Sequence, residues 1–275
     1  MVTAVHHFSA AHMEPLASFG GKLMPSTMVA HCLLVEGSDG LTLVDTGFGT
    51  ADLAQRRMGL AFAQAARLSL DPSNTALSHI NTLGFAASDV RNIVVTHLDL
   101  DHAGGIGDFP DATVHVFVDE LEAARKRATF LEKQRYIPAQ WAHNPNWLPR
   151  SLRGDAWLGF ESVRVVSDDV LLIPMRGHTR GHCAVAVRRP SGGWFLHAGD
   201  AYFDAGEKEK PPTCLPGLRH FQTLMQMDAK ARVTNQERLR TLYAEHGPSS
   251  GSAEPVTMFC AHSEAEFAAL ADVTD

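Results

Sequence analysis

Thr-His-Leu-Asp-Leu-Asp-His-Ala-Gly-Gly, residues 96–105, places four potential metal ligands within six positions: His97, Asp99, Asp101 and His102. The apolar run before it, residues 93–95, predicts a buried strand, and the glycines at its end favour the start of a helix. Alternate side chains of an extended segment share one face, so the first three candidates can point together while the two leucines point into the core. Imidazole and carboxylate groups suit zinc, iron or manganese. The stretch therefore predicts a metal site, with a solvated acidic turn as the alternative.

This stretch resembles the metal-binding signature of the metallo-β-lactamase superfamily, His-x-His-x-Asp-His, except that Asp99 stands in place of the second histidine. The resemblance implies an α/β fold, a four-layer αββα sandwich in which two mixed β-sheets lie face to face and helices flank them. It also implies a metal centre at one edge of the sheets. Matching motifs spread over nearly the whole chain, so we expect a single domain of residues 1–275.

Two further segments resemble superfamily motifs. Val44-Asp45-Thr46-Gly47 implies that Asp45 supports the metal ligands from behind, although Asp-Thr-Gly also occurs in ordinary turns. The segment Gly177-His178-Thr179-Arg180-Gly181-His182 implies that His178 is a ligand, because flanking glycines let the backbone turn sharply. His182 is then expected to be a supporting or buried histidine.

The last two motifs lie near the C-terminal end. Ala198-Gly199-Asp200 follows a short predicted strand, and the resemblance implies that Asp200 is a carboxylate bridging two metal ions. His262 follows the final predicted strand and would be the last ligand. The implied ligand set is His97, Asp99 and His178 at one position, Asp101, His102 and His262 at the other, and Asp200 between them.

Hydrophobic periodicity and turn residues predict the elements that carry these motifs. Helices are expected over residues 51–72, 73–84 and 119–128 and, as one long helix, over 218–246. Strands are expected over residues 28–34, 41–44, 93–95, 113–118, 161–166, 170–173, 183–188, 194–196 and 256–260.

Residues 129–160 interrupt this pattern with tryptophans and prolines at irregular spacing. We interpret them as a lid or wall over the substrate, with Trp141 and His143 as substrate contacts. A structural cover over the sheet, or a contact in a homodimer, is the alternative. Tyr202 lies two residues after Asp200, so it is a candidate donor to a substrate oxyanion, with a packed aromatic side chain as the alternative.

The composition excludes several classes of protein. With 275 residues, 45% of them hydrophobic, the chain can bury a large core. No segment has the roughly 18 to 20 apolar residues of a membrane span. The net charge of −7 argues against a nucleic-acid partner. Residues 1–11 show no signal pattern and the four cysteines form no Cys-x-x-Cys pair, so we expect a cytoplasmic enzyme with reduced cysteines acting on a small molecule.

The implied chemistry is hydrolysis at two divalent metal ions. Metal binding can lower the pKa of water from about 15.7 to around 7, so a bridging hydroxide would attack an acyl carbonyl while Asp101 takes and passes on the proton. The chain has no Ser-x-x-Lys or Gly-x-Ser-x-Gly motif, which argues against a serine nucleophile. Within the superfamily, the motif set most resembles hydrolases of acyl esters, with a lactone as the expected substrate.

Asp99 is the departure with the largest consequence. Zinc is the expected metal, but a carboxylate in place of an imidazole favours manganese or iron at that position. With three aspartates, a hydroxide and two divalent ions the centre would be neutral, whereas a histidine at position 99 would leave one positive charge. The alternatives are hydrolysis of thioesters, as in glyoxalase II, or of phosphodiesters, a metal-containing binding or regulatory protein without turnover, and an oxygen-handling metalloprotein.

Overall fold

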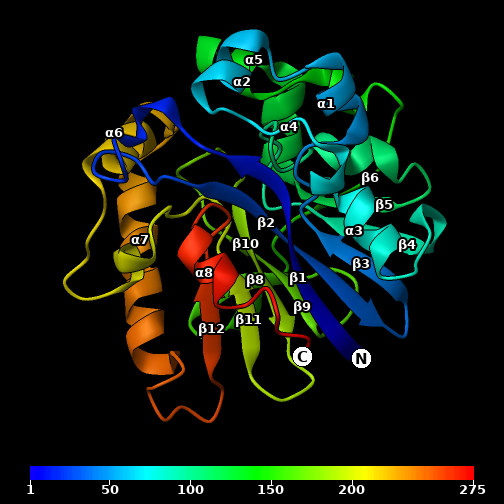
Figure 1. Ribbon diagram of the computed structural model, residues 1–275. Coiled ribbons are helices and arrows are strands. Elements are labelled where there is room, and N and C mark those ends of the chain that lie inside the picture. The colour runs from blue at the N-terminus through cyan, green and yellow to red at the C-terminus, as the bar shows by residue number, and fades with distance from the viewer.

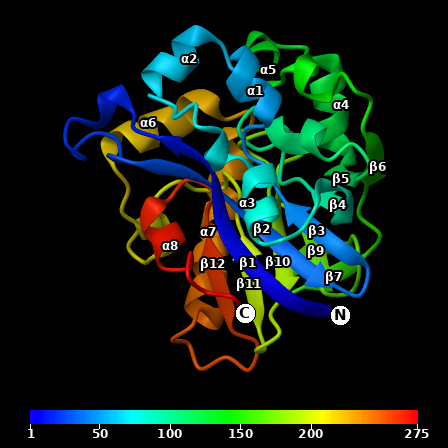
Figure 2. The same ribbon diagram turned by 45° about the vertical axis from the view of Figure 1, so that its right-hand side comes forward.

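Two six-stranded sheets pack face to face in the computed structural model, which describes residues 1–275 (Figure 1). The views in Figures 1 and 2 show α3 (Ala76–Thr82) and α4 (Val118–Lys126) outside the first sheet and α7 (Ala229–His246) outside the second. Helices, two mixed sheets and helices therefore follow one another as four layers. This is the αββα architecture that the resemblance implied, and the prediction of the fold class is confirmed.

The first sheet has the strand order β1-β2-β3-β4-β5-β6. Antiparallel pairing joins β1 to β2 and β2 to β3, and the remaining pairs are parallel. The patterning missed β1, and it placed β6 inside the irregular segment, where Pro149 is tolerated because the strand lies at the edge of the sheet. The strands are β1 (Val2–Met13), β2 (Met28–Gly37), β3 (Gly40–Val44), β4 (Val90–Val94), β5 (Thr113–Phe117) and β6 (Asn146–Arg150).

The second sheet has the strand order β12-β11-β10-β9-β8-β7. Its pairs are antiparallel except for β11 with β12, which are parallel because α6 and α7 lie between them in sequence. The strands are β7 (Asp155–Trp157), β8 (Phe160–Arg164), β9 (Val170–Pro174), β10 (Cys183–Arg188), β11 (Trp194–His197) and β12 (Val256–Phe259).

Two predicted helices are each divided in the structure. The segment 51–72 forms α1 (Thr50–Gln55) and α2 (Leu60–Ala65), because Arg56 and Gly59 adopt left-handed φ angles of 51° and 80°. The segment 218–246 forms α6 (Pro216–Met225) and α7, whose first turn is capped by the Asp228 carboxylate. The glycines after the loop that contains residues 97–102, called the ligand loop below, begin a short 3₁₀ helix, Gly104–Asp108, rather than an α-helix.

The segment 129–160 contains more regular structure than its sequence indicated. Besides β6 and β7, it forms α5 (Phe130–Arg135) and a 3₁₀ turn, Pro138–Trp141. The remaining helix, α8 (Glu264–Ala268), follows β12 and packs against β1 and β2. None of the helices has the length and apolar character needed to cross a membrane.

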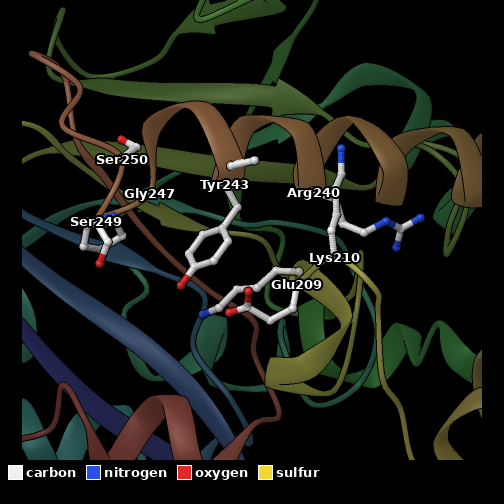
Figure 3. Close-up of a pocket in the computed structure, with 10 residues that line it drawn as sticks. Glu209, Lys210, Arg240, Tyr243, Gly247, Ser249 and Ser250 are labelled. Atoms are coloured by element: carbon white, nitrogen blue, oxygen red, sulfur yellow. The ribbon is translucent and has the colours of Figure 1, made fainter.

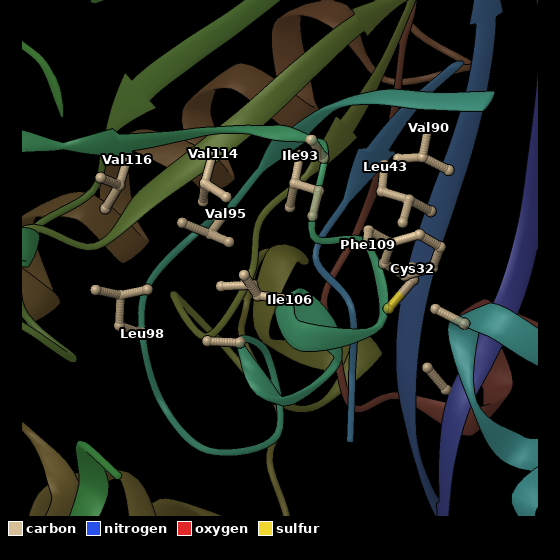
Figure 4. Packing of buried hydrophobic residues seen from close by; sticks show 14 of the residues in the cluster. Cys32, Leu43, Val90, Ile93, Val95, Leu98, Ile106, Phe109, Val114 and Val116 are labelled. Atoms are coloured by element: carbon tan, nitrogen blue, oxygen red, sulfur yellow. The ribbon is translucent and has the colours of Figure 1, made fainter. Parts of the chain in front are cut away.

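Three layers of apolar side chains hold the sandwich together. Between the sheets, valines and leucines such as Val44 and Val94 meet Leu172 and Val185. Outside the first sheet, α3 and α4 cover a second cluster (Figure 4), and α7 covers a third outside the second sheet. Leu98, from within the ligand loop, belongs to the cluster of Figure 4 and is completely buried. Its burial anchors that loop, as predicted, whereas Leu100, which was expected to point into the core as well, is only half-buried and packs beside a different cluster.

Candidate metal centre

The ends of strands from both sheets bring the predicted ligand residues together. The loop after β4 carries the four residues of the first motif, and β11 and β12 end just before Asp200 and His262. His178 comes from the turn between β9 and β10. Segments up to 165 residues apart in sequence therefore converge, although each belongs to a different loop.

Three of these side chains form a first group: His97, Asp99 and His178. The Asp99 Oδ2 atom lies 3.0 Å from Nε2 of His178 and 3.5 Å from Nε2 of His97. All three residues are buried. Three potential ligand atoms thus face one small volume.

A second group consists of Asp101, His102 and His262. The Nε2 atoms of His102 and His262 are 3.4 Å apart, and Asp101 Oδ2 lies 3.7 Å from Nε2 of His262. The two histidines are buried, whereas the Asp101 side chain retains 16% of its exposure. Asp101 is therefore the member of this group that solvent or a substrate can reach.

Asp200 lies between the two groups, and each of its carboxylate oxygens faces a different one. Oδ2 is 3.3 Å from Nε2 of His178 and 3.8 Å from Nε2 of His97. Oδ1 is 3.3 Å from Nε2 of His102 and 3.2 Å from Nε2 of His262. A carboxylate in this orientation can donate one oxygen to each of two cations.

Hydrogen bonds on the far side of the rings leave the Nε2 atoms free to bind a metal. His262 donates from Nδ1 to the carbonyl oxygen of Val29 at 2.7 Å, which fixes its tautomer. His102 Nδ1 lies 2.8 Å from Oδ2 of Asp45. Thr96 Oγ1, 3.0 Å from His97 Nδ1, also donates to Asp45. Asp45 therefore lies behind two of the rings, in direct contact with His102 and linked to His97 through Thr96.

The backbone around Asp45 is shaped for this contact. Asp45 adopts a left-handed φ of 55°, a conformation that aspartate tolerates better than most residues. Gly47 also has a positive φ, 60°, and a Cβ there would lie 2.2 Å from the Cβ of Ala10. The Asp-Thr-Gly sequence is therefore dictated by the turn as well as by the carboxylate.

His182 positions Asp200 rather than joining the ligand set. Its Nδ1 donates to the carbonyl oxygen of Met175 at 3.1 Å, so Nε2 is free to accept the backbone N–H of Asp200 at 2.9 Å. Burial and the neighbouring imidazoles of His97 and His178 hold the pKa of His182 well below its ordinary value, which keeps it neutral. This is the supporting role expected from the sequence.

The residues present fit divalent cations. Nε2 of His97 and Oδ1 of Asp200 are buried without hydrogen-bond partners, an arrangement that proteins avoid unless another group binds there. Burial alone would raise the pKa of Asp200, but the imidazoles of His262, His102 and His178 hold it well below its usual range. An ionised carboxylate among imidazole nitrogens suits zinc, manganese or iron.

Arg135, at the end of α5, is a member of the site that sequence reasoning missed. Its guanidinium is buried, and Nε lies 3.3 Å from Oδ1 of Asp99. Burial opposes ionisation of Asp99, but Arg135 and His97 hold the pKa of that carboxyl well below its usual range. The charge count made from the sequence lacks this cation. No local pattern in Phe130–Arg135 distinguishes Arg135 from the charged residues beside it.

Glu120, in the first turn of α4, is a second missed residue. Its buried carboxylate accepts hydrogen bonds from the Leu98 N–H and the Tyr136 hydroxyl on one oxygen. The other oxygen accepts from the Thr179 hydroxyl and the Gly181 N–H. One side chain thus joins the loop of His97 to the loop of His178. The sequence predicts a helix over residues 119–128, but nothing in its pattern distinguishes Glu120 from the other charged residues of that helix.

The structure corrects the expectation that Tyr202 donates to a substrate oxyanion. Its hydroxyl lies 3.1 and 3.3 Å from the two carboxylate oxygens of Glu266, so its proton is held within the core. Tyr202 is 2% exposed and belongs to the cluster beneath α7. The prediction relied on the closeness of Tyr202 to Asp200 in the sequence. In the structure it is the next residue, Phe203, whose ring turns toward His178 and His262.

Neither Trp141 nor His143 makes a side-chain hydrogen bond or ring contact with a proposed ligand, and their role as substrate contacts stays a prediction. Trp141 packs against the cluster outside the first sheet and meets Trp147 edge-on, with 6.3 Å between ring centroids. His143 is exposed beside Gly107, 3.6 Å from the position of a Cβ there. The segment instead reaches the ligand loop through Gln140, whose Nε2 donates to the carbonyl oxygen of Leu100 at 2.8 Å. This arrangement favours the alternative of a structural cover.

An apolar wall adjoins the ligand cluster on the side of Phe203. The Phe203 ring stacks on the imidazole of His262 at 5.2 Å between centroids and lies 5.9 Å from that of His178. Phe221 of α6 meets Phe203 edge-on at 5.6 Å. Half-buried side chains continue this surface: Met24, Phe62, Leu100, Leu215 and Phe221.

A separate pocket lies between α7 and the loop of Lys208–Lys210 (Figure 3). It contains no residue of the ligand cluster. Its cations are already paired, since Lys208 contacts Glu266 while Lys210 and Arg240 contact Glu237. The pocket thus offers no unpaired cation to a ligand, and the metal-ligand cluster is the candidate site.

Known proteins resemble the chain over most of its length. Residues 27–252 match the model of the metallo-beta-lactamase superfamily. A probable metallo-hydrolase of Mycobacterium tuberculosis is 38% identical over 262 residues, which cover 94% of this chain and 79% of that protein. An N-acyl homoserine lactonase of Bacillus cereus is 30% identical over 176 residues, covering 62% of this chain and 63% of the lactonase.

A solved structure shares the fold. It is an N-acyl homoserine lactone hydrolase with the product N-hexanoyl-L-homoserine bound at its catalytic metal centre. The TM-score is 0.72 at 20% identity, and the superposition covers 98% of this chain and 96% of the other. At this identity the likeness shows the architecture alone.

Proposed function

The chain belongs to the metallo-beta-lactamase superfamily, and on this premise we propose that it is a metal-dependent hydrolase of acyl esters with lactones as its substrates. The observation that carries the proposal is the orientation of Asp200, whose two oxygens face two separate groups of ligand atoms. Such a carboxylate suits a pair of cations better than a single one. Two divalent ions held there would polarise a substrate carbonyl and lower the pKa of water.

The residues that would hold the ions are the two groups of three with Asp200 between them. We assign His97, Asp99 and His178 to one position and Asp101, His102 and His262 to the other. Zinc, manganese and iron all suit this mixture of imidazole and carboxylate groups.

Asp101 is the residue we assign to proton transfer. Its side chain is more exposed than those of the other proposed ligands, and its oxygens lie 3.9 and 3.7 Å from the Nε2 atoms of His102 and His262. A carboxylate at the open side of the cluster can take a proton from the attacking water and release it to the leaving oxygen. No tyrosine is assigned to the oxyanion, since Tyr202 is engaged by Glu266.

The apolar wall supports an acyl substrate. Phe203 is buried beside His262, and the half-buried ring of Phe221 from α6 packs against it, so an alkyl chain can lie against the accessible side of Phe221. Pockets for small molecules combine such apolar walls with a few polar groups that fix orientation. The N-acyl homoserine lactonase among the relatives acts on a substrate of this type by its name, which agrees with a lactone bearing an acyl chain.

The test is an elemental analysis of the purified protein combined with a substrate panel of acyl lactones, thioesters, phosphodiesters and a cephalosporin. We expect bound metal, lactone hydrolysis that a chelator abolishes and added metal restores, and a fall of more than about 100-fold in His178→Ala. His220→Ala, which changes an exposed histidine of α6, is the matched control and should keep full activity.

Other outcomes of this panel assign other functions. Hydrolysis of only thioesters or only phosphodiesters would replace the lactone with that substrate class. Bound metal without turnover of any substrate would indicate a binding or regulatory protein, the alternative that the departure at Asp99 leaves open.

A further inference from the structure

Arg135 is held rigidly beside the first ligand group. Its Nη1 donates to the carbonyl oxygen of His178 and its Nη2 to that of Met225, each at 2.9 Å. These two bonds fix the plane of the guanidinium, and Nε then faces Oδ1 of Asp99 at 3.3 Å. Arg135 therefore touches two of the three residues in that group, one through its backbone and one through its carboxylate.

The two oxygens of Asp99 have different partners. Oδ2 faces the imidazoles of His178 and His97, whereas Oδ1 faces Arg135. The guanidinium thus favours the orientation in which a single oxygen points at the metal position. In this orientation the carboxylate presents one ligand atom, as an imidazole would.

The charges of the pair balance within a buried environment. A carboxylate in a buried ligand group adds a negative charge that an imidazole would not, and Arg135 adds one positive charge. Asp99 is the one carboxylate within ion-pair distance of Arg135, which is only 2% exposed. A buried guanidinium is costly unless it is paired, so the position of Arg135 indicates that it balances the negative charge of Asp99.

We propose that Arg135 is a positioning residue: it orients the carboxylate of Asp99 and balances its charge, so that the Asp99–Arg135 pair takes the place of one neutral histidine among the metal ligands. This inference rests on the metal centre of the proposed function. It implies that metal affinity depends on Arg135 when residue 99 is aspartate, and depends on it much less when residue 99 is histidine.

A double-mutant cycle tests this dependence. Wild type, Arg135→Met, Asp99→His and the double variant are compared by metal stoichiometry and by competition with a chromophoric chelator. We expect Arg135→Met to weaken one of the two metal equivalents by about 10- to 100-fold, the range for residues that orient a ligand. The double variant should recover most of that loss, because histidine needs no compensating cation.

The controls separate a specific effect from a general one. Arg180→Met removes a half-exposed arginine that lies two residues after His178 in the chain and pairs with Glu132. This variant should bind both metal equivalents with unchanged affinity. Arg135→Lys keeps the positive charge but lacks the planar guanidinium that donates to the carbonyl oxygens of His178 and Met225. Its loss of metal affinity should be smaller than that of Arg135→Met. Thermal unfolding of each variant shows whether it is folded, and Arg135→Lys replaces Arg135→Met in the cycle if the latter is not.

Two results would overturn the inference while leaving the metal centre intact. One is an Arg135→Met protein with two metal equivalents at wild-type affinity. The other is a cycle in which the two substitutions act independently, since this would give Arg135 a structural role unrelated to Asp99. A wild-type protein that binds no metal at all would instead remove the metal centre itself, and the proposed function with it.

Discussion

The carboxylate of Asp45 lies 2.8 Å from Nδ1 of His102, on the opposite side of the ring from the ligand cluster. The same carboxylate accepts the backbone N–H and the hydroxyl of Thr96, each at 2.7 Å. All three contacts place a donor against an acceptor oxygen. Asp45 therefore fixes both the tautomer of His102 and the backbone at the start of the ligand loop.

Asp45→Asn should weaken metal binding at the position of His102. Asparagine has one acceptor oxygen, so whichever way the amide is turned its NH₂ group faces another donor from Thr96 or His102. We expect a fall of about 10- to 100-fold in affinity for one of the two metal equivalents. Chelator competition measures this, and Asp39→Asn, in the exposed turn between β2 and β3, is the control. Unchanged affinity would show that Asp45 serves only the turn.

Glu120→Gln should destabilise the protein. Each carboxylate oxygen of Glu120 accepts from one hydroxyl, which can rotate away, and from one backbone N–H, which cannot. The glutamine NH₂ group must therefore oppose one fixed N–H, of Leu98 or of Gly181, at a cost of about 1–3 kcal/mol.

Chemical denaturation of Glu120→Gln measures that cost. Glu122→Gln, at an exposed position of the same helix, should be neutral. Tyr136→Phe removes one donor and leaves the carboxylate with three, so its effect should be the smaller one. Equal stabilities for Glu120→Gln and Glu122→Gln would contradict the role of Glu120 as the link between the two loops.

The sequence predicted those candidate ligands that lie directly beside a recognisable strand end in the chain. Asp45, His178, Asp200 and His262 each follow an apolar run and lie next to a glycine or another small residue, so a strand end and its ligand can be identified together. Most strands of the two sheets can likewise be predicted from the sequence, because they are short apolar runs between turn residues. Long-range convergence then required only that the strand ends share one edge.

The parts that the sequence concealed depend on contacts between distant segments. Arg135 and Glu120 lie in charged helices, and only the fold shows that they are buried against Asp99 and Leu98. The tendency of a charged helical residue to face solvent was overridden by the packing of α4 and α5 over the ligand loops. β1 was missed because alanines and histidines weaken its alternating pattern.

Phe221→Ala tests the apolar wall as a site for an acyl chain. The substitution removes a ring that meets Phe203 at 5.6 Å, and Phe203 in turn stacks on His262, a proposed metal ligand. If lactones with long chains lie along this wall, kcat/KM for a ten-carbon acyl lactone should fall by about 10-fold, whereas a four-carbon one should be unaffected. Phe130→Ala changes a ring on α5 that is 79% exposed and is the control. Equal losses for both chain lengths would place the acyl chain elsewhere.

Asp52 should make the stability of the protein fall as the pH rises. Burial raises the pKa of this carboxyl to about 6 in the folded protein, whereas in the unfolded chain it is about 3.9. Between these values the folded state binds more protons than the unfolded state, so the free energy of unfolding decreases with pH. The contribution is complete below about pH 4 and is lost as the pH passes 6.

Asp52→Asn should remove this loss while keeping the hydrogen bonds of residue 52, and the contact it gives up is the ion pair of Oδ1 with Nη1 of Arg57 at 3.9 Å. Oδ2 of Asp52 accepts from the Gly49 N–H and from Nε2 of Gln140, and the asparagine oxygen can take its place. Oδ1 has no hydrogen-bond partner, so an NH₂ group there loses none. Urea denaturation of both proteins at pH 5 and pH 7 should show the variant gaining about 1 kcal/mol relative to wild type at the higher pH. A stability difference that does not change with pH would mean that Asp52 is ionised throughout this range.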